Sequence, residues 1–577
     1  TSGLTFGDQG WRLQYKQTGT GTAGTSTIGA DTSGEGNHWT SNNLVASDVM
    51  PDSPTLNFGT FNSIHDDTTG ASTEVFSQGN LRVGESGNGW SNIFGSQGMP
   101  SGKWYWESYM AGSGTVDCLF GIAKSNWYIG SDGGLETAGA YTIYQHSNGN
   151  LYSWNNASQT NEGTTVTFTW DDILQVAYDA DTGKLWFGKS NTWLFSGDPA
   201  AGSTPKMTIG ASDIGDMLPA WSQYHPDSAW GVNFGQDSSF AGNETAQGNA
   251  DGNGIGDFYY APPSGFLALC TSNLPDPVAT IDPNQGGSPQ DYFNTVLYTG
   301  TGGTQSISVG FQPDFTWNKQ RSGTDYHALQ NSVAGPTKIL VSNTTEAERT
   351  ITDCLTAFTS TGFTLGADSS GYGNENTQTY ASWNWKVGGS SSVNTDGTDI
   401  DSTGLFNTDL GMSIVTYTGT GSSGDSYGHG LDKAPELVLV KDRTDPANWA
   451  VYSVTTGLNG YLRLNDTNTK TDDSNIFPSV SATTIGVGTQ GDGSIANTSG
   501  DSYVSYNFHS VDGYSKIGSY IGNESANGPF VYTGFRPAFL MTKKTSATSN
   551  WIIKDNKRDA SGGNVITTLF KANDTSA

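Results

Sequence analysis

Few residues of this chain have the types and spacing that chemistry needs. The seven histidines stand at positions 38, 65, 146, 225, 327, 429 and 509, and no two lie within four residues of each other. The local pair that a zinc-binding helix provides, as in His-Glu-x-x-His, is therefore missing. We expect no metalloprotease, hydrolase, P-loop or Rossmann site, and hence no enzyme.

The 55 acidic residues leave one catalytic alternative open. A glycosidase needs two facing carboxylates about 5–10 Å apart, and a sequence this rich in acids does not exclude such a pair. Asp171 and Asp172 are adjacent, but neighbours on a strand point to opposite faces and do not easily share one site. Most of the acids are expected to be solvated turn residues.

Three loops carry oxygen ligands at short spacing, at residues 251–257, 368–376 and 492–501. An EF-hand also needs a bidentate Glu at its twelfth position and flanking helices, and neither is evident. Asp, Asn and Gly favour such loops because they tolerate tight turns. We therefore expect no cofactor and assign no metal ligand, with structural calcium as the open alternative.

The elements that would position these side chains are clearest at residues 171–193. Residues 173–179 and 184–188 predict two strands, and the turn between them ends at Gly183, which is free to adopt positive φ. Upstream, residues 101–107 read Ser-Gly-Lys-Trp-Tyr-Trp-Glu and predict another strand of alternating bulk. An aromatic β-meander is therefore expected to organise this part of the chain.

Composition favours the same structural class along all 577 residues. Charged residues make up only 14%, aromatic residues 12%, and there are 77 glycines. This mixture suits short strands joined by tight turns, and so many aromatic residues argue against disorder. The fold class we predict is all-β, with tandem β-sandwich domains.

Net charge and cysteine content limit the partners and the compartment. The net charge is −29, with no run of Lys or Arg, so nucleic acid is not an expected partner. No apolar stretch approaches the ~18–20 residues that span a bilayer, so no membrane insertion is expected. The three cysteines are far apart, which argues against a disulfide framework and a zinc site and indicates synthesis in a reducing cytoplasm.

An internal repeat follows a linker at residues 276–293. Each unit opens with a motif of the Tyr-Thr-Gly-x-Gly type and continues through a Pro-led apolar strand, a Lys, an aromatic strand and an Asn-x-Thr turn. The recurring landmarks are Pro313, Pro435 and Pro537; Lys319, Lys441 and Lys543; Tyr326, Trp449 and Trp551; and Asn343, Asn465 and Asn573. Landmarks in one order indicate a true repeat, and we expect each unit to be an independent sandwich of about 100 residues.

A later aromatic strand distinguishes the first two units from the third. In the first unit this strand spans residues 380–385 and has Ala381, Trp383 and Trp385 on one face. In the second it spans residues 503–508 and has Val504, Tyr506 and Phe508 on one face. We interpret these rings as domain cores, with an exposed sugar-stacking platform as the alternative. The third unit lacks this strand, so either the chain is truncated or a neighbouring subunit completes the sheet.

Two resemblances follow from these motifs. Gly-Lys-Trp-Tyr-Trp-Glu followed by Asp-x-Asp-x-Gly-Lys-Leu-Trp-Phe resembles the SPRY family, which implies a two-sheet sandwich used for recognition. Gln175 departs from that pattern, because the family commonly has Gly there. The order of a SPRY-like domain and Gly/Thr-rich repeats resembles virion proteins of tailed phages, especially marine ones.

The phage resemblance implies a non-enzymatic structural protein of the virion, such as a tail fibre, spike or decoration component. Implied partners are other virion proteins, copies of the chain itself and host-surface polysaccharide. A glycan-depolymerising tailspike and a secreted bacterial adhesin or filament subunit are the alternatives. As ligand contacts we single out the loop aromatics Trp127, Tyr128 and Trp154, each of which core packing also explains.

The predicted boundaries combine these observations. Residues 1–55 are expected to be the end of an upstream β-domain plus a linker, and residues 56–275 the SPRY-like sandwich. The three repeats are expected at residues 294–395, 412–515 and 516–577, with the last one incomplete.

Overall fold

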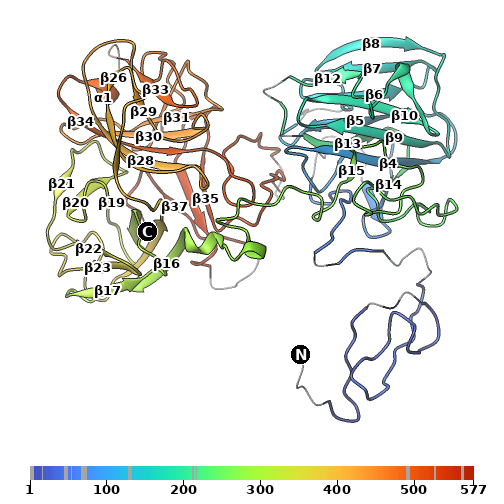
Figure 1. The fold of residues 1–577 in the computed structure, drawn as a ribbon, viewed down its shortest axis with the longest axis horizontal. Helices are drawn as coiled ribbons and strands as arrows, with labels where there is room; N and C mark the ends of the chain where they lie inside the picture. Colours follow the sequence, from blue (N-terminus) through green and yellow to red (C-terminus); the bar gives the residue numbers. More distant parts are fainter. Residues whose placement is uncertain are drawn as a thin grey trace. The chain divides into compact units, whose positions relative to one another are not determined.

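The computed structural model describes residues 6–576 except residues 16, 18, 45–49, 54, 66–73, 128–132, 211–212, 216, 489–493, 525–527 and 560–564. Nearly all regular structure is β-strand, as predicted (Figure 1). The short helical pieces are α1 (Ser494–Asn497) and the 3-10 turns Leu194–Ser196, Pro283–Gln285 and Pro289–Asp291. The chain divides into two compact units: residues 1–275 with 520–532, and residues 276–519 with 533–577.

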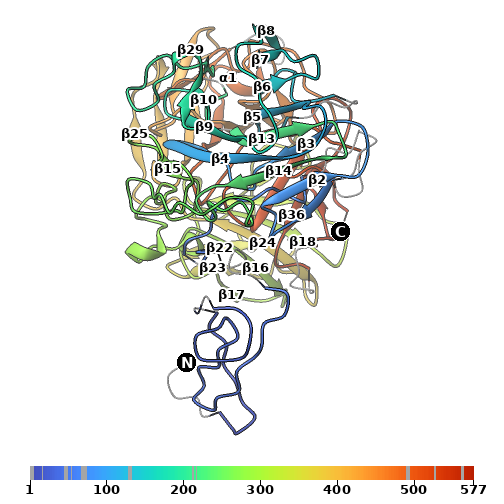
Figure 2. The same cartoon turned by 90° about the vertical axis from the view of Figure 1, so that its right-hand side faces the viewer.

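Unit 1 contains a two-sheet sandwich, seen from its side in Figure 2. The first sheet has the order β1 (Glu74–Ser77), β2 (Arg82–Glu85), β14 (Ser228–Asn233), β4 (Lys103–Gly112), β9 (Ile173–Asp179), β10 (Lys184–Lys189) and β11 (Thr192–Trp193), with β12 (Met207–Thr208) beside β10 and β15 (Leu267–Ala268) beside β4. The second has the order β3 (Ser91–Phe94), β13 (Met217–Gln223), β5 (Cys118–Lys124), β6 (Ala140–Gln145), β7 (Leu151–Asn155) and β8 (Ser158–Gly163).

The predicted meander lies in the middle of the first sheet. β9 pairs with β10 in antiparallel register, and β4 pairs with the other edge of β9. Gly183 closes the turn between β9 and β10 with φ of +71°, and a Cβ there would lie 2.6 Å from the carbonyl oxygen of Ile209. Trp106, Trp186 and Trp221 are almost fully buried in the core of this unit. The aromatic alternation therefore forms the core, as the sequence indicates.

Residues 6–53 begin unit 1 as turns and isolated bridges, with no extended strand among the residues described there. The bridges join Leu13 to Asp31 and Gly19 to Thr27. Residues 520–532 also belong to unit 1, where Tyr532 packs against a cluster that includes Phe94. The predicted third repeat, which begins at residue 516, therefore includes a stretch that belongs to unit 1.

Unit 2 holds the segments that the sequence predicts to be repeats 1 and 2, together with residues 533–577 of the predicted repeat 3. Repeat 1 has a sheet of β16 (Phe293–Thr299), β24 (Thr379–Trp385), β18 (Phe315–Gln320), β19 (Ala328–Asn331), β20 (Lys338–Val341) and β21 (Arg349–Thr350), and a small sheet of β17 (Gln305–Ser308), β23 (Gly362–Leu365) and β22 (Leu355–Thr359). Repeat 2 has β25 (Ser392–Asn394), β27 (Ser402–Asn407), β28 (Met412–Thr418), β34 (Ser502–Phe508), β30 (Leu437–Asp442), β31 (Ala450–Ser453) and β32 (Leu462–Arg463), with β26 (Asp399–Ile400), β29 (Asp425–Gly428) and β33 (Thr484–Val487) as its small sheet. Repeat 3 has β35 (Phe539–Lys543), β36 (Trp551–Asp555) and β37 (Phe570–Lys571).

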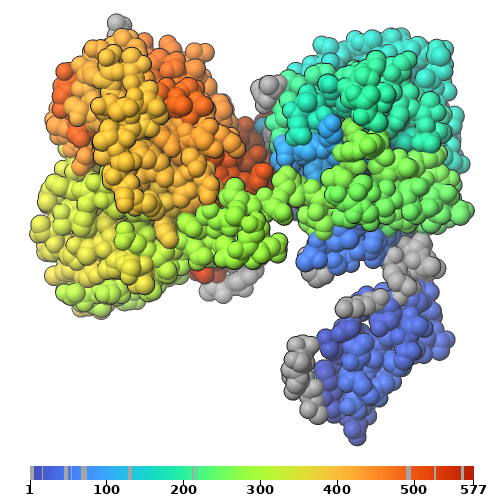
Figure 3. All heavy atoms as spheres, in the orientation of Figure 1, coloured from blue at the N-terminus to red at the C-terminus, as the bar shows by residue number. Residues whose placement is uncertain are grey.

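The repeats share one buried cluster, which differs from the expected independent domains, although repeats 1 and 2 each also have buried clusters of their own. Trp383 of repeat 1, Trp449 of repeat 2 and Trp551 of repeat 3 belong to the same buried cluster. In the space-filling view the three repeats, coloured yellow-green to red, form one continuous body (Figure 3). Trp383 is fully buried and Trp385 is half-buried, so the interpretation of these rings as core is confirmed.

Equivalent backbone hydrogen bonds close the three repeats into a ring. The N–H of Ala447 donates to the carbonyl of Thr345 (2.8 Å), Ser549 to Thr467 (2.9 Å) and Asp325 to Thr575 (3.1 Å). Each acceptor is the third residue of an Asn-x-Thr landmark. The second repeat is thus bound to the first, the third to the second, and the first to the third.

The predicted aromatic landmark of repeat 1, Tyr326, lies one residue before the position that is equivalent to the landmarks of the other repeats. The N–H groups of Trp449 and Trp551 donate to the side chains of Asn465 and Asn573. In repeat 1 the residue that makes this bond, to Asn343, is His327 and not Tyr326. A histidine therefore occupies the tryptophan position of the other two repeats.

Repeat 3 keeps only the strands that reach the shared core. Among the residues that the structure describes, β35 pairs with β36 alone, whereas β18 and β30 also pair with the aromatic strands β24 and β34. Leu540 of β35 is 46% exposed, while its equivalent Val438 in β30 is fully buried. Completion of this sheet by a neighbouring subunit stays a prediction.

Candidate functional site

A buried carboxylate lies at the centre of the first sheet of unit 1. Glu107 of β4 is fully buried, and one oxygen accepts the Tyr105 hydroxyl (2.9 Å) and the N–H of Tyr260 (2.7 Å). The other accepts the N–H of Tyr259 (2.8 Å) and the Asn233 side-chain amide (3.1 Å). Burial raises the pKa of Glu107 to about 7, although these four donors favour the charged form. Glu107 therefore fastens the loop at residues 259–260 onto β4.

Gln175 extends this network, which gives its departure from the SPRY pattern a structural role. Its side-chain amide donates to the Tyr105 hydroxyl (3.0 Å), and its carbonyl oxygen accepts the N–H of Asn191 (2.8 Å). A glycine at this position could make neither bond. The network joins β4, β9 and the turn after β10.

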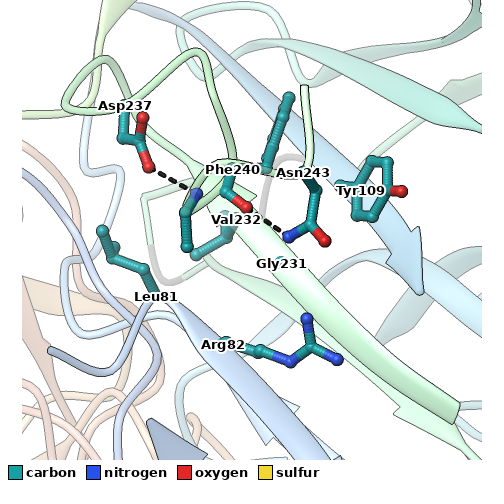
Figure 4. Close-up of a pocket in the computed structure, with 9 residues that line it drawn as sticks. Leu81, Arg82, Tyr109, Gly231, Val232, Asp237, Phe240 and Asn243 are labelled. Carbon is teal, nitrogen blue, oxygen red and sulfur yellow. Dashed lines mark hydrogen bonds between the residues drawn. The ribbon is translucent and has the colours of Figure 1, made fainter. Parts of the chain in front are cut away.

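A shallow pocket lies over β2, β4 and β14, beside the loop at residues 237–243. Figure 4 shows Arg82, Tyr109 and Asn243 around it, and both hydrogen bonds drawn there lie inside the loop. The side-chain amide of Asn243 donates to the carbonyl of Phe240 (2.5 Å), and the N–H of Ala241 donates to the carboxylate of Asp237 (2.7 Å). The enclosed volume of about 10 Å³ is room for roughly one water molecule. This pocket is too small for a sugar or a cofactor.

Two of the three predicted ligand contacts, Trp127 and Trp154, lie in the described part of the chain and pack in one cluster. Trp127 is 5% exposed, and its indole N–H donates to the Thr137 hydroxyl (3.1 Å). Trp154 is half-buried and packs beside the same cluster of buried side chains. Tyr128 lies outside the described residues. Trp127 is therefore packed in the core, in line with the alternative of core packing, and a role of these residues as ligand contacts stays a prediction.

The adjacent acids Asp171 and Asp172 have separate partners. Asp171 accepts the hydroxyl of Tyr109 at 2.6 Å. Asp172 accepts the N–H of Thr169 at 2.6 Å and pairs with the ammonium of Lys189 at 2.7 Å. These bonds tie the turn before β9 to β4 and to the end of β10, in line with the expectation that the two acids do not share a site.

The loops for which calcium was the open alternative use their carboxylates as hydrogen-bond acceptors. Asp251 accepts four N–H donors at 2.8–2.9 Å, two from its own loop and two from Ala268 and Asn273. Asp368 accepts the N–H groups of Gly373 and Asn374, both at 2.5 Å. Asp492 lies outside the described residues. Within the described part of the chain, no three His, Cys, Asp or Glu side chains are grouped to hold a metal.

Several stretches fit the letter patterns of enzyme motifs, so the expectation that no such pattern occurs is wrong at the level of the letters. Residues 19–24, 419–424 and 486–491 read Gly-x-Gly-x-x-Gly. The first follows no extended strand among the described residues, the second leads into β29 and not into a helix, and the third lies partly outside the described residues.

Two further stretches fit a nucleophile elbow and a P-loop. Residues 424–428 read Gly-Asp-Ser-Tyr-Gly, and residues 183–190 read Gly-Lys-Leu-Trp-Phe-Gly-Lys-Ser. A nucleophile elbow or a P-loop needs a turn that leads into a helix. Here the first stretch lies in β29 and the second in β10, and the Ser426 hydroxyl accepts the N–H of Thr398 (3.0 Å). Both stretches are sheet segments.

Buried lysines lie at the junctions of unit 2. The ammonium of Lys319 donates to the carbonyl of Thr575 (3.1 Å), and that of Lys543 donates to the carbonyl of Thr467 (3.1 Å). Lys441 donates to the carbonyl of Asp442 (2.7 Å). Burial lowers the pKa of Lys319 and of Lys441 to about 8. The buried Lys319 and the half-buried Lys543 therefore link neighbouring repeats, whereas the bond of the buried Lys441 stays within repeat 2.

Sequence reasoning missed one exposed feature, the indole pair of Trp11 and Trp39. Their ring centroids are 5.3 Å apart and their planes meet at 69°. The two residues are 28 positions apart in a Gly/Thr-rich segment without strand periodicity, so no sequence pattern joins them. The structure is needed to find this pair, because only the structure shows that both rings are exposed and in contact.

The described part of the chain thus consists mainly of β-sandwiches. The carboxylates and lysines described above hold its loops and the junctions between its repeats. Residues 288–577 match the family model described as "Domain of unknown function (DUF7483)", and the chain belongs to that family. No curated protein sequence matches the chain. No helix among the residues described has the length and apolar character to cross a membrane.

Many solved structures are similar to part of the chain, among them two SPRY domains and stonustoxin. The SPRY domain of human HERC1 is 16% identical, with a TM-score of 0.23, and the match covers 29% of this chain and 96% of that one. The TRIM65 PSpry domain is 13% identical, with a TM-score of 0.23 and coverage of 30% and 88%. The stonustoxin structure is 14% identical, with a TM-score of 0.22 and coverage of 30% and 28%.

Proposed function

We propose that this chain is a non-enzymatic structural protein of a tailed-phage virion that also contacts host-surface polysaccharide. Its place would be a tail fibre, a spike or a decoration on the particle, and its partners would be other virion proteins and copies of itself. The proposal combines the sandwich fold with the resemblance of the repeats to phage virion modules.

The observation that carries the proposal is the ring of repeats in unit 2. Three equivalent backbone bonds at 2.8–3.1 Å and a shared buried cluster join the repeats into one compact unit. The junction of repeats 1 and 2 also has a two-pronged ion pair, in which Arg443 donates to both oxygens of Glu348 (2.8 and 3.0 Å). Such a body suits a protein that bears load on a particle surface.

The uses of the carboxylates support a structural role over catalysis. A glycosidase keeps two acids free to face the sugar. Glu107, Asp251 and Asp368 instead each accept several N–H or hydroxyl donors from their own unit. A side chain committed in this way is poorly placed to donate or accept a proton from a substrate.

The location is tested on purified phage particles of the strain that encodes the chain. We expect the protein in the particle by mass spectrometry, and gold-labelled antibodies at one repeated position in electron micrographs. Particles without the protein, or protein secreted from uninfected cells, would refute the virion assignment and favour a bacterial adhesin.

The non-enzymatic part is tested with host capsular polysaccharide and the purified protein. We expect the protein to bind the polysaccharide in a pull-down without generating new reducing ends over a day. A steady release of reducing ends would instead identify a depolymerase.

A further inference from the structure

Two tryptophans near the start of unit 1 are exposed. All 17 tryptophans lie in the described part of the chain, and only Trp11 and Trp39 are exposed, at 48% and 52%. The two rings meet edge to face, with centroids 5.3 Å apart. An exposed indole usually lies alone on a surface, whereas this pair forms one apolar patch.

A buried carboxylate holds the backbone beside both rings. Asp31 is 7% exposed, and one of its oxygens accepts the N–H of Arg12 (2.8 Å), the residue after Trp11. Its other oxygen accepts the N–H of Asn37 (2.9 Å), two residues before Trp39. Asp31 therefore fixes the two parts of the chain that carry the rings.

Further bonds fix the same two stretches. The side-chain amide of Asn37 donates to the carbonyl of Gly10 (2.8 Å), and the Nδ1 atom of His38 accepts the N–H of Asp31 (2.9 Å). The N–H of Trp39 itself donates to the carbonyl of Gly29 (2.8 Å). A segment without regular strands is thus bonded on both sides of each ring, so the pair is organised before any ligand arrives.

The size of the patch limits what it could bind. Two half-exposed indoles offer on the order of 200 Å² of apolar surface. A stable protein interface needs about 800 Å² on each partner, so the pair alone is too small for one. The face of a pyranose ring, with its C–H groups against an aromatic face, matches this area.

The net charge of the chain favours a neutral sugar over an anionic one. The chain has a net charge of −29, which opposes the approach of an anionic polysaccharide. We propose that Trp11 and Trp39 form a binding site for neutral hexopyranose units of a polysaccharide. This inference rests on the proposed contact with host-surface polysaccharide and assigns residues to it.

The test uses the full chain and three neutral probes, maltohexaose, cellohexaose and laminarihexaose. Saturation-transfer NMR reads the sugar C–H protons that contact the protein. We expect at least one hexasaccharide to give a signal with the wild-type chain, and Trp11→Ala and Trp39→Ala each to reduce it at least fivefold. Tyr326→Ala is the matched control, because Tyr326 is an aromatic residue of unit 2 with 38% exposure, and it should leave the signal unchanged.

Each other outcome overturns the inference. If none of the three sugars binds the wild-type chain, the site does not take neutral hexopyranoses. If a sugar binds equally well to both tryptophan variants, its site lies elsewhere, while the polysaccharide contact itself stands. If the variants lose binding to a virion protein and keep sugar binding, the patch is a protein contact. The virion assignment is read separately, from the particles.

Discussion

The indole N–H of Trp449 donates to the backbone carbonyl of Val341 at 2.9 Å, across the junction of the second and first repeats. Trp551 makes the same bond to the carbonyl of Arg463 at 2.8 Å, across the next junction. Both carbonyls belong to the last strand of the preceding repeat's hairpin, so the two tryptophans join neighbouring repeats in the same way.

Trp449→Phe should weaken unit 2. The change leaves the buried carbonyl of Val341 without its donor, at a cost of about 1–3 kcal/mol in the free energy of unfolding. Urea unfolding followed by far-UV circular dichroism measures the difference. Trp170→Phe is the matched control, because the indole of Trp170 also donates to a carbonyl, that of Gly114 (2.8 Å), but at an exposed site. Equal losses in the two variants would contradict a special role for the junction.

Glu107 should make the stability of unit 1 depend on pH. Its pKa in the folded protein is about 7, above the ordinary value of 4.5, so the folded state holds this proton more tightly than the unfolded state. The free energy of unfolding should therefore fall as pH rises from about 4.5 to 7, by about 3 kcal/mol. Urea unfolding of wild type and Glu107→Gln at pH 5, 6, 7 and 8 isolates this contribution. A constant difference between the two proteins across this range would argue against it.

Lys441 should act in the opposite pH direction. Its pKa in the folded protein is about 8, below the ordinary value of 10.5, so the folded state holds this proton less tightly. The free energy of unfolding should rise as pH increases from 8 to 10.5, and Lys441→Met should remove that rise. At pH 7 we expect Lys441→Met to be about 1–2 kcal/mol more stable than wild type.

Lys338→Met is the matched control for this experiment. The Lys338 ammonium donates to the Thr350 hydroxyl at an exposed site (2.8 Å), and its replacement should change stability by less than about 0.5 kcal/mol. A destabilised Lys441→Met protein with an unaffected control would show that the ammonium's bond to the Asp442 carbonyl outweighs the cost of its burial.

Removal of calcium should have no effect on thermal stability. The carboxylate of Asp251 already accepts four N–H donors, and that of Asp368 accepts two more at 2.5 Å. We expect the melting temperature to agree within about 1 °C in EDTA and in millimolar CaCl₂, since a ligand that binds only the folded state would raise it. A clear rise in CaCl₂ would assign an ion to a loop of this chain.

Much of the fold could be predicted from local patterns. Alternating bulk and the turn at Gly183 predict β9 and β10, and the lysine and Asn-x-Thr landmarks predict three repeats. The landmarks do not indicate that Lys543 of one repeat meets Thr467 of another, because contacts between repeats leave no periodicity in the sequence. The aromatic landmark was shifted to Tyr326 because repeat 1 has a histidine where the other repeats have tryptophan.

The candidate site was harder to predict, since burial decides it. Trp127 and Trp154 are aromatic residues of the kind that binding loops use, yet Trp127 is enclosed by the core. Trp11 and Trp39 stand in a segment that composition marks as a linker. Their organisation depends on Asp31, which lies 20 residues from Trp11 and accepts bonds near both rings.

The bond between Lys319 and Thr575 spans 256 residues of sequence. During synthesis the first repeat therefore emerges from the ribosome long before the carbonyl it needs has been made. Contacts of such long range slow folding. The nascent chain must therefore keep the edge of its first repeat soluble until the third repeat has been translated, and a chaperone that binds this edge would serve that need.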